Sequence, residues 1–432
     1  MSIQKSIYLA GMRFRNGKIF DCYASLKESE GWSLERLRQN QLDRLKQLLD
    51  HAYRNSPHYQ KKFDAHGFHP CQLKSLEDLP LVPVTLKEEV LDHCKEIQLT
   101  VRGEKMFFSE TSGSTGRPLV FYRNQEWDAW HNASVMRGYS WHGVSPWEKN
   151  GYLWGYNIAP RKRFKVKMLD LLQNRFRLFS YEERQLDAFL KKLESAAFLN
   201  GYSSMVYEVA RRVNATGSSH RYRLKMVKGT SEKIYDAYRV EVEKAFGIPI
   251  VSEYGSAEGG IIAFECAKGS MHINMETVIV EQVDDEVVLT NLVSSSFPII
   301  RYKLGDYIRL GAGGCACGMA HPVIEEVTGR VGAVIRGKSN SYPSLTLYYV
   351  FKNLASEKGV ILNYQAIQRK AGELELLVEN QVDAKGMQDL DAELAKYFGN
   401  DLEVAVRVGV ARSNFNSKKK DFVSEIGAAA GR

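Results

Sequence analysis

A glycine-punctuated loop between two short strand-like runs constrains the fold of this chain more than any other feature of its sequence. The loop is Thr111–Pro118 (TSGSTGRP), and the runs beside it are 105–110 and 119–122. Its glycines let the backbone approach oxygens that a Cβ would obstruct, and Arg117 adds a charge suited to phosphate. A Walker loop has Gly-x-x-x-x-Gly-Lys-Ser/Thr with a helix directly after it. The strand–loop–strand pattern therefore excludes that fold and favours another kind of anion site, with an ordinary loop as the alternative.

The loop belongs to a longer alternation of strand-like and helical runs. This alternation covers residues 100–330 and is typical of a layered α/β domain. Before it, residues 33–54 begin with Ser33 as an N-cap and repeat leucines, from Leu34 to Leu49, on one helical face. The N-terminal part of the chain is therefore expected to contain a long helix with one apolar face.

The pattern changes after residue 332. Strand-like runs at 361–368, 373–378 and 402–408 accompany a helical run at 387–398. Such a compact α+β unit is within the usual size range of a domain. We therefore predict an α/β fold with a large layered N-terminal domain, residues 1–332, and a small C-terminal lid domain, residues 333–432.

Composition and charge exclude several classes of protein. No window approaches the roughly 18 consecutive apolar residues of a membrane span, and Lys5, Arg13 and Arg15 leave no apolar signal core at the N-terminus. The net charge of +8 is small for 432 residues, and the basic runs at 161–167 and 418–420 are interpreted as solvated faces. We therefore expect a cytoplasmic protein that neither spans a membrane nor binds nucleic acid.

Two further motifs follow strand-like runs, where the ligand-binding loops of open α/β sheets lie. The first, residues 253–260 (EYGSAEGG), contains Tyr254, which could stack on a flat base, and Glu258, which could hold a divalent cation against phosphates. The second, residues 301–306 (RYKLGD), ends in an aspartate that could accept both hydroxyls of a ribose, and residues 329–330 (GR) could donate to the same sugar or to phosphate. Turns with solvated carboxylates are the alternative for both motifs.

Three cysteines and a histidine form a second candidate site. Five residues separate Cys266 from His272, and 42 more separate His272 from the Cys-x-Cys-Gly motif at Cys315 and Cys317. Three thiolates and an imidazole suit a closed, tetrahedral zinc site, which would brace the segment and not react. The alternatives are that Cys266 and His272 are unrelated core residues, or that His321 supplies the imidazole.

In this order and spacing, the loop and the two motifs resemble those of the adenylate-forming enzymes. The strongest resemblance is to the phenylacetate–CoA ligase family and its CapK-like branch, which is linked to capsular polysaccharide genes, and it covers most of the chain. It implies an enzyme that uses ATP and Mg²⁺ to convert a carboxylic acid into an acyl-adenylate, then passes the acyl group to coenzyme A or another acceptor. It also implies a structural zinc ion and, as a family expectation, a homodimer.

The resemblance also assigns roles to individual residues. Residues 111–117 would hold the ATP phosphates, and residues 229–232 would line the adenine site. Tyr254 would stack on adenine, while Asp306 and Arg330 would hold the ribose. The complete predicted ATP-binding set is Thr111, Ser112, Gly113, Ser114, Thr115, Gly116, Arg117, Ser231, Glu232, Glu253, Tyr254, Gly255, Asp306 and Arg330. Glu258 is the predicted Mg²⁺ ligand and a catalytic residue. The predicted zinc ligands are Cys266, His272, Cys315 and Cys317.

A C-terminal lysine is expected near the carboxylate and the α-phosphate, because positioning and charge neutralisation dominate this chemistry. The family places a Gly-Lys pair before an aromatic residue and a valine, and residues 417–423 (SKKKDFV) lack that glycine. Lys419 gives the best register and Lys418 the second, with a solvated basic tail as the alternative. At the hinge, Gly332 and Ala333 stand where the family usually has an acidic residue, although a glycine can still absorb a large rotation.

The identity of the acid is not predicted. Aromatic residues concentrate after the loop, and at helical spacing most of them would be core residues. Corresponding segments of the family imply an acid pocket lined by Trp154, Tyr156, Tyr202 and Ser256. Three interpretations remain open: a CoA ligase, an adenylating enzyme with a sugar, amine or carrier thiol as acceptor in surface-polysaccharide assembly, and a zinc-braced binding protein or degenerate enzyme without ligase activity.

Overall fold

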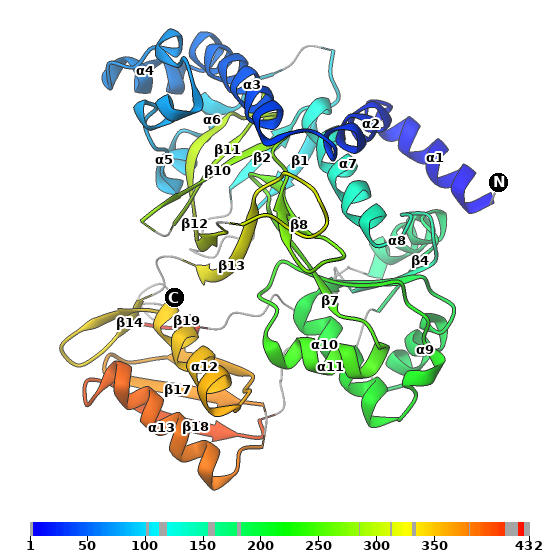
Figure 1. The fold of residues 1–432 in the computed structure, drawn as a ribbon, viewed down its shortest axis with the longest axis vertical. Coiled ribbons are helices and arrows are strands. Elements are labelled where there is room, and N and C mark those ends of the chain that lie inside the picture. The colour runs from blue at the N-terminus through cyan, green and yellow to red at the C-terminus, as the bar shows by residue number, and fades with distance from the viewer. Residues whose placement is uncertain are drawn as a thin grey trace.

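The computed structural model describes residues 3–100, 103–111, 119–153, 160–178, 183–284, 286–311, 313–330, 334–379, 381–410 and 422–426. Over these ranges the chain forms a large layered unit and a smaller α+β unit at its C-terminal end (Figure 1). This architecture is the predicted fold class. The boundary predicted between residues 332 and 333 lies outside the described residues and stays a prediction.

A mixed sheet forms the centre of the large unit. Its strands are β3 (Asn150–Leu153), β4 (Arg175–Arg177), β5 (Phe198–Tyr202), β6 (Met226–Thr230), β7 (Ile250–Ser256), β8 (Gly260–Glu265), β9 (Met271–Ile273), β10 (Val278–Val283), β11 (Glu286–Asn291), β12 (Ile299–Leu310) and β13 (Val323–Arg330). Among the described residues they follow the order β10-β11-β12-β13-β9-β8-β7-β6-β5-β3-β4. Pairs from β4 to β7 are parallel, and pairs from β7 to β10 are antiparallel. The sheet therefore changes from parallel to antiparallel pairing at β7.

Helices cover the parallel half of the sheet. They are α8 (Pro160–Leu172), α9 (Glu183–Leu193), α10 (Ser203–Ala215) and α11 (Asp236–Phe246), with a 3-10 turn η3 (Ser219–Arg221). Val206, Val209 and Val213 of α10 are buried together with Leu199 of β5 and Val227 of β6. Because β5 and β6 are covered in this way, their residues form continuous buried runs and not an alternating pattern.

N-terminal helices pack on the other half of the sheet. They are α1 (Ile3–Asn16), α2 (Ile19–Ser29), α3 (Leu34–Asn55), α4 (Pro57–Ala65), α5 (Lys87–Asp92), α6 (Cys94–Ile97) and α7 (Gln125–Trp141), with 3-10 turns η1 (Pro70–Gln72) and η2 (Leu76–Leu81). The Ser33 Oγ accepts a hydrogen bond from the Arg36 N–H at 3.2 Å, which confirms the predicted N-cap of α3. Leu34 was expected on the buried face but is 43% exposed, because it begins the helix at the rim of the core. Within the described residues, no helix is long and apolar enough to cross a membrane.

Two pairs of consecutive strands form antiparallel hairpins. The strands β1 (Phe107–Glu110) and β2 (Val120–Arg123) pair antiparallel, with Glu110 opposite Val120. The strand–loop–strand setting of the glycine-rich loop is thus confirmed, while residues 112–118 themselves lie outside the described part of the chain. In the second hairpin, β10 and β11 pair with Val283 opposite Glu286.

The C-terminal unit has its own core. It contains β14 (Val334–Arg336), β15 (Ser341–Pro343), α12 (Leu345–Lys358), β16 (Tyr364–Gln368), β17 (Glu373–Val378), α13 (Ala384–Phe398), β18 (Glu403–Val408) and β19 (Phe422–Ser424). Its four-stranded sheet has the order β18-β17-β16-β19, in agreement with the strands and the helix predicted there. Helix α12 was not predicted. It lies against β13, and the rings of Tyr235 and Tyr364 meet at 6.1 Å between the two units.

Candidate active site and metal centre

Several of the predicted nucleotide motifs lie at the carboxyl-terminal ends of the parallel strands in the large sheet. β5, β6 and β7 are parallel, so their carboxyl ends lie at the same edge, where ligands bind in open α/β sheets. These ends place Tyr202, the Ser231–Glu232 pair and residues 253–256 side by side. The sheet topology therefore brings together segments that are up to about fifty residues apart in the sequence.

A tight turn at residues 257–259 joins β7 to β8 and carries Glu258. A Cβ on Gly255 would lie 2.4 Å from the Gly260 carbonyl oxygen, so this close crossing requires glycine. The Ser256 Oγ accepts a hydrogen bond from the Gly259 N–H at 2.8 Å. The Asn291 amide donates to the Glu258 carbonyl oxygen at 2.8 Å. Local sequence and one long-range contact thus fix the backbone that holds Glu258.

The Glu258 side chain is 6% exposed. One carboxylate oxygen accepts a hydrogen bond from the Tyr302 hydroxyl at 3.3 Å. Tyr302 belongs to the predicted 301–306 motif, so two motifs from different parts of the sequence meet at this carboxylate. Mg²⁺ is commonly bound through one or two carboxylates together with substrate phosphates, and a single oriented glutamate fits that role.

Tyr254 and Asp306, predicted to bind adenine and ribose, are also in contact. The Tyr254 hydroxyl donates to Asp306 Oδ2 at 2.9 Å. Asp306 lies opposite Arg330 in the pairing of β12 with β13, although the Arg330 side chain is outside the described part. Asp306 and Arg330 therefore lie on neighbouring strands, and Tyr254 reaches Asp306 from β7 through its side chain.

The predicted ATP-binding residue Glu253 is held by an internal cation. Lys228 is 4% exposed, and its Nζ donates to Glu253 Oε2 at 2.6 Å. The Thr230 hydroxyl donates to the other carboxylate oxygen at 2.9 Å. Sequence reasoning missed Lys228, although a lysine within the apolar strand run 225–229 was a signal for a buried partner. In this arrangement Glu253 ties β6 to β7 directly beneath the candidate site.

Glu232 serves as a cap in this structure. Its Oε2 accepts a hydrogen bond from the Ser204 N–H at 2.9 Å, at the start of α10. Ser231 before it has a φ of 64°, in the left-handed region. Burial raises the pKa of the nearby Tyr202, a predicted acid-pocket residue. These residues shape the edge of the sheet beside Tyr254.

Several predicted site residues lie outside the described ranges. They are Ser112, Gly113, Ser114, Thr115, Gly116, Arg117, Trp154, Tyr156, Lys418 and Lys419. Thr111 is described and closes the base of the loop, because its N–H donates to the Leu119 carbonyl at 3.0 Å and its hydroxyl accepts from the Leu119 N–H at 2.9 Å. The roles predicted for this group therefore stay predictions.

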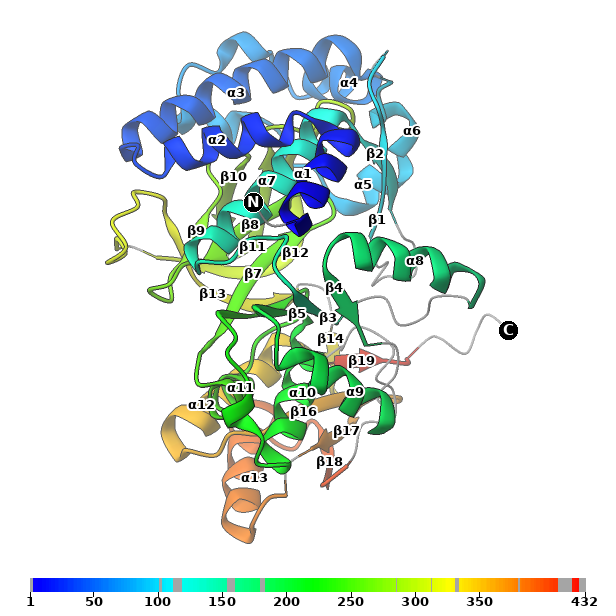
Figure 2. The same ribbon diagram turned by 90° about the vertical axis from the view of Figure 1, so that its right-hand side faces the viewer.

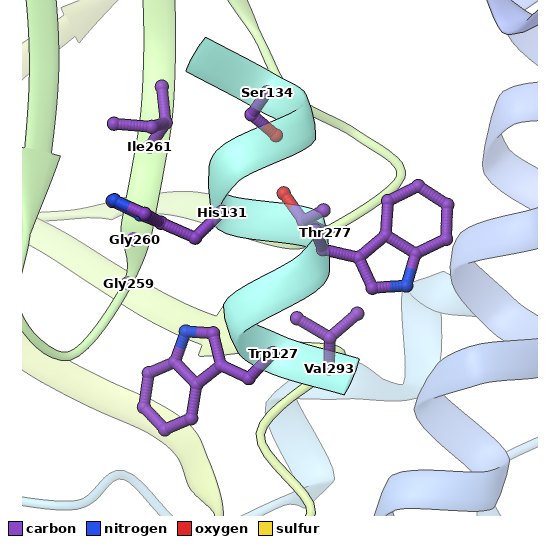
Figure 3. A pocket seen from close by; sticks show the side chains of 9 residues that line it. Trp127, His131, Ser134, Gly259, Gly260, Ile261, Thr277 and Val293 are labelled. Atoms are coloured by element: carbon purple, nitrogen blue, oxygen red, sulfur yellow. The ribbon is translucent and has the colours of Figure 1, made fainter. Parts of the chain in front are cut away.

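A small polar cavity lies behind the 257–259 turn (Figure 3). Trp127, His131 and Ser134 of α7 line it, and His131 Nδ1, Trp127 Nε1 and Ser134 Oγ have no hydrogen-bond partner among the described residues. Burial, together with the Arg123 charge, lowers the pKa of His131 to about 4, so the ring is neutral at pH 7. The cavity offers about 10 Å³ to the centre of a water molecule, which is room for roughly one. A water there would link α7 to Gly260.

The predicted metal ligands come together at the other end of β8. Cys266 follows β8, His272 lies in β9, and Cys315 and Cys317 lie between β12 and β13. Their four ligand atoms all lie within 4.8 Å of one another. The sulfurs of Cys266 and Cys315 are 3.7 Å apart, close to the roughly 3.8 Å edge of a tetrahedron with Zn–S bonds of about 2.3 Å. The donor set and its geometry therefore fit zinc.

The surroundings of the four ligands support the same assignment. His272 contacts Cys317 Sγ through Nε2 at 3.2 Å, while its Nδ1 lies 2.9 Å from the His321 carbonyl oxygen. A ring nitrogen fixed by a carbonyl is typical of a metal-binding histidine. The rival imidazole, His321, instead places Nε2 2.8 Å from Glu276 Oε1. His321 therefore contacts the cluster through its backbone carbonyl, and its ring is not among the four side chains that could hold a metal ion.

Replacing Cys315 with serine is expected to remove stoichiometric zinc from the purified protein, because a closed site with three ligands loses its tetrahedral geometry. Metal analysis of the purified variant would measure this. Cys71→Ser is the matched control, since Cys71 is exposed, lies in η1 and is not one of the four clustered side chains. Unchanged zinc in the Cys315 variant would contradict the assignment.

Comparisons with known proteins agree with these motifs. Phenylacetate–coenzyme A ligase of Escherichia coli is 27% identical over 304 residues, covering 64% of this chain and 68% of the relative. The Thermus thermophilus enzyme of the same name is 27% identical, covering 82% and 83%. Protein CapK of Staphylococcus aureus is 25% identical over 63% of this chain, and the match spans only 62% of CapK. No protein-family model matches the chain.

A solved structure has a similar fold. 2-Hydroxyisobutyryl-CoA ligase, in a postadenylation state with its acyl-AMP, has a TM-score of 0.71 at 17% identity, covering 91% of this chain and 90% of that one. The chain is therefore a relative of phenylacetate–coenzyme A ligases and CapK, as its motifs predicted, and it has the fold of the adenylate-forming acid–CoA ligases.

Proposed function

We propose that this chain is an ATP-dependent, AMP-forming acid ligase. A carboxylate oxygen of the acid attacks the α-phosphorus of ATP, the bond to the β-phosphate oxygen breaks, and pyrophosphate leaves. The acyl-adenylate then gives its acyl group to the thiol of coenzyme A and releases AMP. The observation that carries this proposal is the convergence of Glu258, Tyr254 and Asp306 at one edge of the sheet in a chain related to such ligases.

Each residue then has a role that its contacts support. Tyr254 presents its ring beside the nucleoside site while its hydroxyl orients Asp306 toward the ribose. Glu258 would hold Mg²⁺, which neutralises the charge of the phosphates and the leaving pyrophosphate. The glycine-rich loop, residues 111–117, would donate to the phosphates from the end of the β1–β2 hairpin. The zinc centre would brace the antiparallel half of the sheet.

Acid-dependent exchange of labelled pyrophosphate into ATP across a mixed library of carboxylic acids tests the reaction class. We expect exchange with at least one acid and none without acid. If no acid supports exchange and ATP does not bind, the ligase proposal fails and the binding-protein interpretation replaces it. The same experiment identifies the acid, because the active member of the library can be traced.

The acceptor requires a separate experiment. The phenylacetate–coenzyme A ligases among the relatives favour coenzyme A, whereas the match to CapK keeps a sugar, amine or carrier thiol of surface-polysaccharide assembly open. We propose coenzyme A as the acceptor. With the active acid, product should form as AMP plus thioester only when coenzyme A is present, and accumulated acyl-adenylate in its presence would favour another acceptor.

Lys419→Ala is expected to slow adenylation by about 10²–10³-fold and leave ATP affinity nearly unchanged, because the lysine would act on charge that develops in the transition state. Single-turnover formation of the acyl-adenylate measures the rate, and titration with ATP measures the affinity. Lys418→Ala is the matched comparison one position away. Full activity of the Lys419 variant with loss in the Lys418 variant would move the role to Lys418.

A further inference from the structure

An exposed apolar stripe follows one face of helix α1. Ile3, Ile7 and Phe14 are 72%, 42% and 91% exposed. Their spacing of four and then seven residues places them on the same side of an α-helix. The opposite side holds the helix in place, because the Tyr8 ring lies 6.0 Å from the Trp147 ring. This apolar stripe therefore faces away from the core.

Helix α8 presents a second exposed apolar face. Phe164, Met168 and Leu171 are 73%, 46% and 72% exposed and lie on one side of the helix. The buried side is anchored by an acidic residue: Asp170 is 4% exposed and binds Arg175 and, at 3.1 Å, Arg177. This is the reverse of the usual surface helix, which turns its apolar side inward.

The two helices lie next to each other on the same side of the molecule (Figure 2). α1 and α8 are in contact, and in Figure 2 both lie on the side of the molecule that faces the reader. We call this surface the α1–α8 face, defined by Ile3, Ile7, Phe14, Phe164, Met168, Leu171 and Leu172.

The exposed charged side chains of α1 and α8 are of one sign. The sequence of α1 contains Lys5, Arg13 and Arg15 and no acidic residue. The sequence of α8 contains five basic residues, and its single acid, Asp170, is buried. Arg15 is engaged by Asp128, but Lys165 and Lys167 are exposed beside the apolar side chains of α8. Apolar side chains flanked by cations are the pattern of helices that lie in a membrane interface.

We propose that the α1–α8 face binds the surface of an anionic phospholipid bilayer, with the apolar side chains in the headgroup region and the lysines on lipid phosphates. The positive charge of the α1–α8 face favours an anionic bilayer as the partner. A second copy of the chain would place two cationic faces against each other, whereas an anionic bilayer neutralises them. The attachment is peripheral and is independent of the proposed ligase activity.

Co-sedimentation of the full chain with vesicles tests the proposal. Binding is expected to vesicles of 70% phosphatidylcholine and 30% phosphatidylglycerol, with weaker binding in 0.5 M salt and little to phosphatidylcholine alone. Each lysine near an anionic surface contributes roughly five-fold to binding, so Lys165→Gln/Lys167→Gln should weaken it about 25-fold. Phe164→Glu/Leu171→Glu should abolish it.

Matched controls keep the test decisive. Val240→Glu places one glutamate on α11 at a residue that is 56% exposed, and it should bind like the unmodified chain. All of these side chains are exposed, so the thermal unfolding midpoint should not change. Equal binding to both vesicle types, or unchanged binding of the α8 variants, would overturn the proposal. So would a vesicle-free dimer, detected by light scattering, that Phe164→Glu/Leu171→Glu dissociates, because the face would then bind a second copy.

Discussion

Replacing Glu258 with glutamine is expected to lower acid-dependent pyrophosphate release by about 10²–10³-fold, the usual effect of removing one group that stabilises developing charge. Glutamine has nearly the same shape and can still accept the hydrogen bond that Tyr302 donates at 3.3 Å. The turn should therefore persist while the charge that would bind Mg²⁺ is lost. Steady-state kinetics across a range of Mg²⁺ concentrations would show a lower kcat and a raised requirement for the metal.

Glu393→Gln is the control for this experiment. Glu393 is 8% exposed, almost as buried as Glu258, and it accepts a hydrogen bond from Asn353 at 2.8 Å within the C-terminal unit. It lies in α13, and Asn353 and Lys396, which donate to it, belong to the C-terminal unit as well, so its amide variant should keep full activity. A Glu258 variant as active as the Glu393 variant would remove Glu258 from the reaction, even if the ligase activity itself were established by exchange with the active acid.

Local sequence signals predicted the elements that depend on local chemistry. Ser33 caps α3, and β1 and β2 form the strands predicted on either side of the glycine-rich loop. Helix α12 was missed because Thr346, Tyr348 and Tyr349 are better suited to strands by intrinsic propensity. Burial of Leu347, Val350 and Leu354 against the C-terminal core overrides that preference. Their spacing of three and four residues was a helical signal that propensity concealed.

Prediction of the candidate site from the sequence was incomplete for a different reason. Residue types and order predicted Glu258, Tyr254 and Asp306 as site residues, but the side chains that contact them could not be predicted from the sequence. Tyr254 meets Asp306 across 52 residues, and Lys228 meets Glu253 across 25. Such contacts depend on the order of the strands in the sheet, and this order could not be predicted from the sequence. The sequence also left two imidazoles as candidates for the metal cluster, and the pairing of β9 with β13 places the His272 ring, and not the His321 ring, beside the cysteines.

A buried ion network joins the N-terminal helices to the sheet. Arg137 of α7 is 1% exposed, and it donates to Glu276 Oε1 at 2.7 Å and to Glu276 Oε2 at 3.1 Å. Arg137 also donates to Asn274, and Glu276 accepts from Ser29 at the end of α2. Three elements therefore depend on one pair of charges that water does not reach.

Arg137→Met is expected to lower the free energy of unfolding by about 3–5 kcal/mol, because it leaves the Glu276 charge buried with no cation of fixed charge. Urea unfolding followed by circular dichroism would measure the loss. The control is Arg54→Met, which breaks the exposed 2.8 Å pair with Asp50 and should cost at most about 0.5 kcal/mol. A loss in the Arg137 variant no larger than in this control would mean that the network contributes little to stability.

The double variant Arg137→Met/Glu276→Leu separates the ion pair from simple loss of packing. Removing both charges should recover much of the lost stability, since an apolar pair of similar volume often replaces a buried ion pair well. The dependence of the free energy of unfolding on pH is a second test of the ion pair. Burial alone would raise the pKa of Glu276, but the Arg137 charge and the contact with His321 outweigh it and hold the pKa below its ordinary value. The stability that the Glu276 carboxylate contributes is fully present above its unfolded pKa of about 4.3 and is lost as the pH falls. Because the double variant lacks this carboxylate, its free energy of unfolding should fall less in acid than that of the unmodified chain.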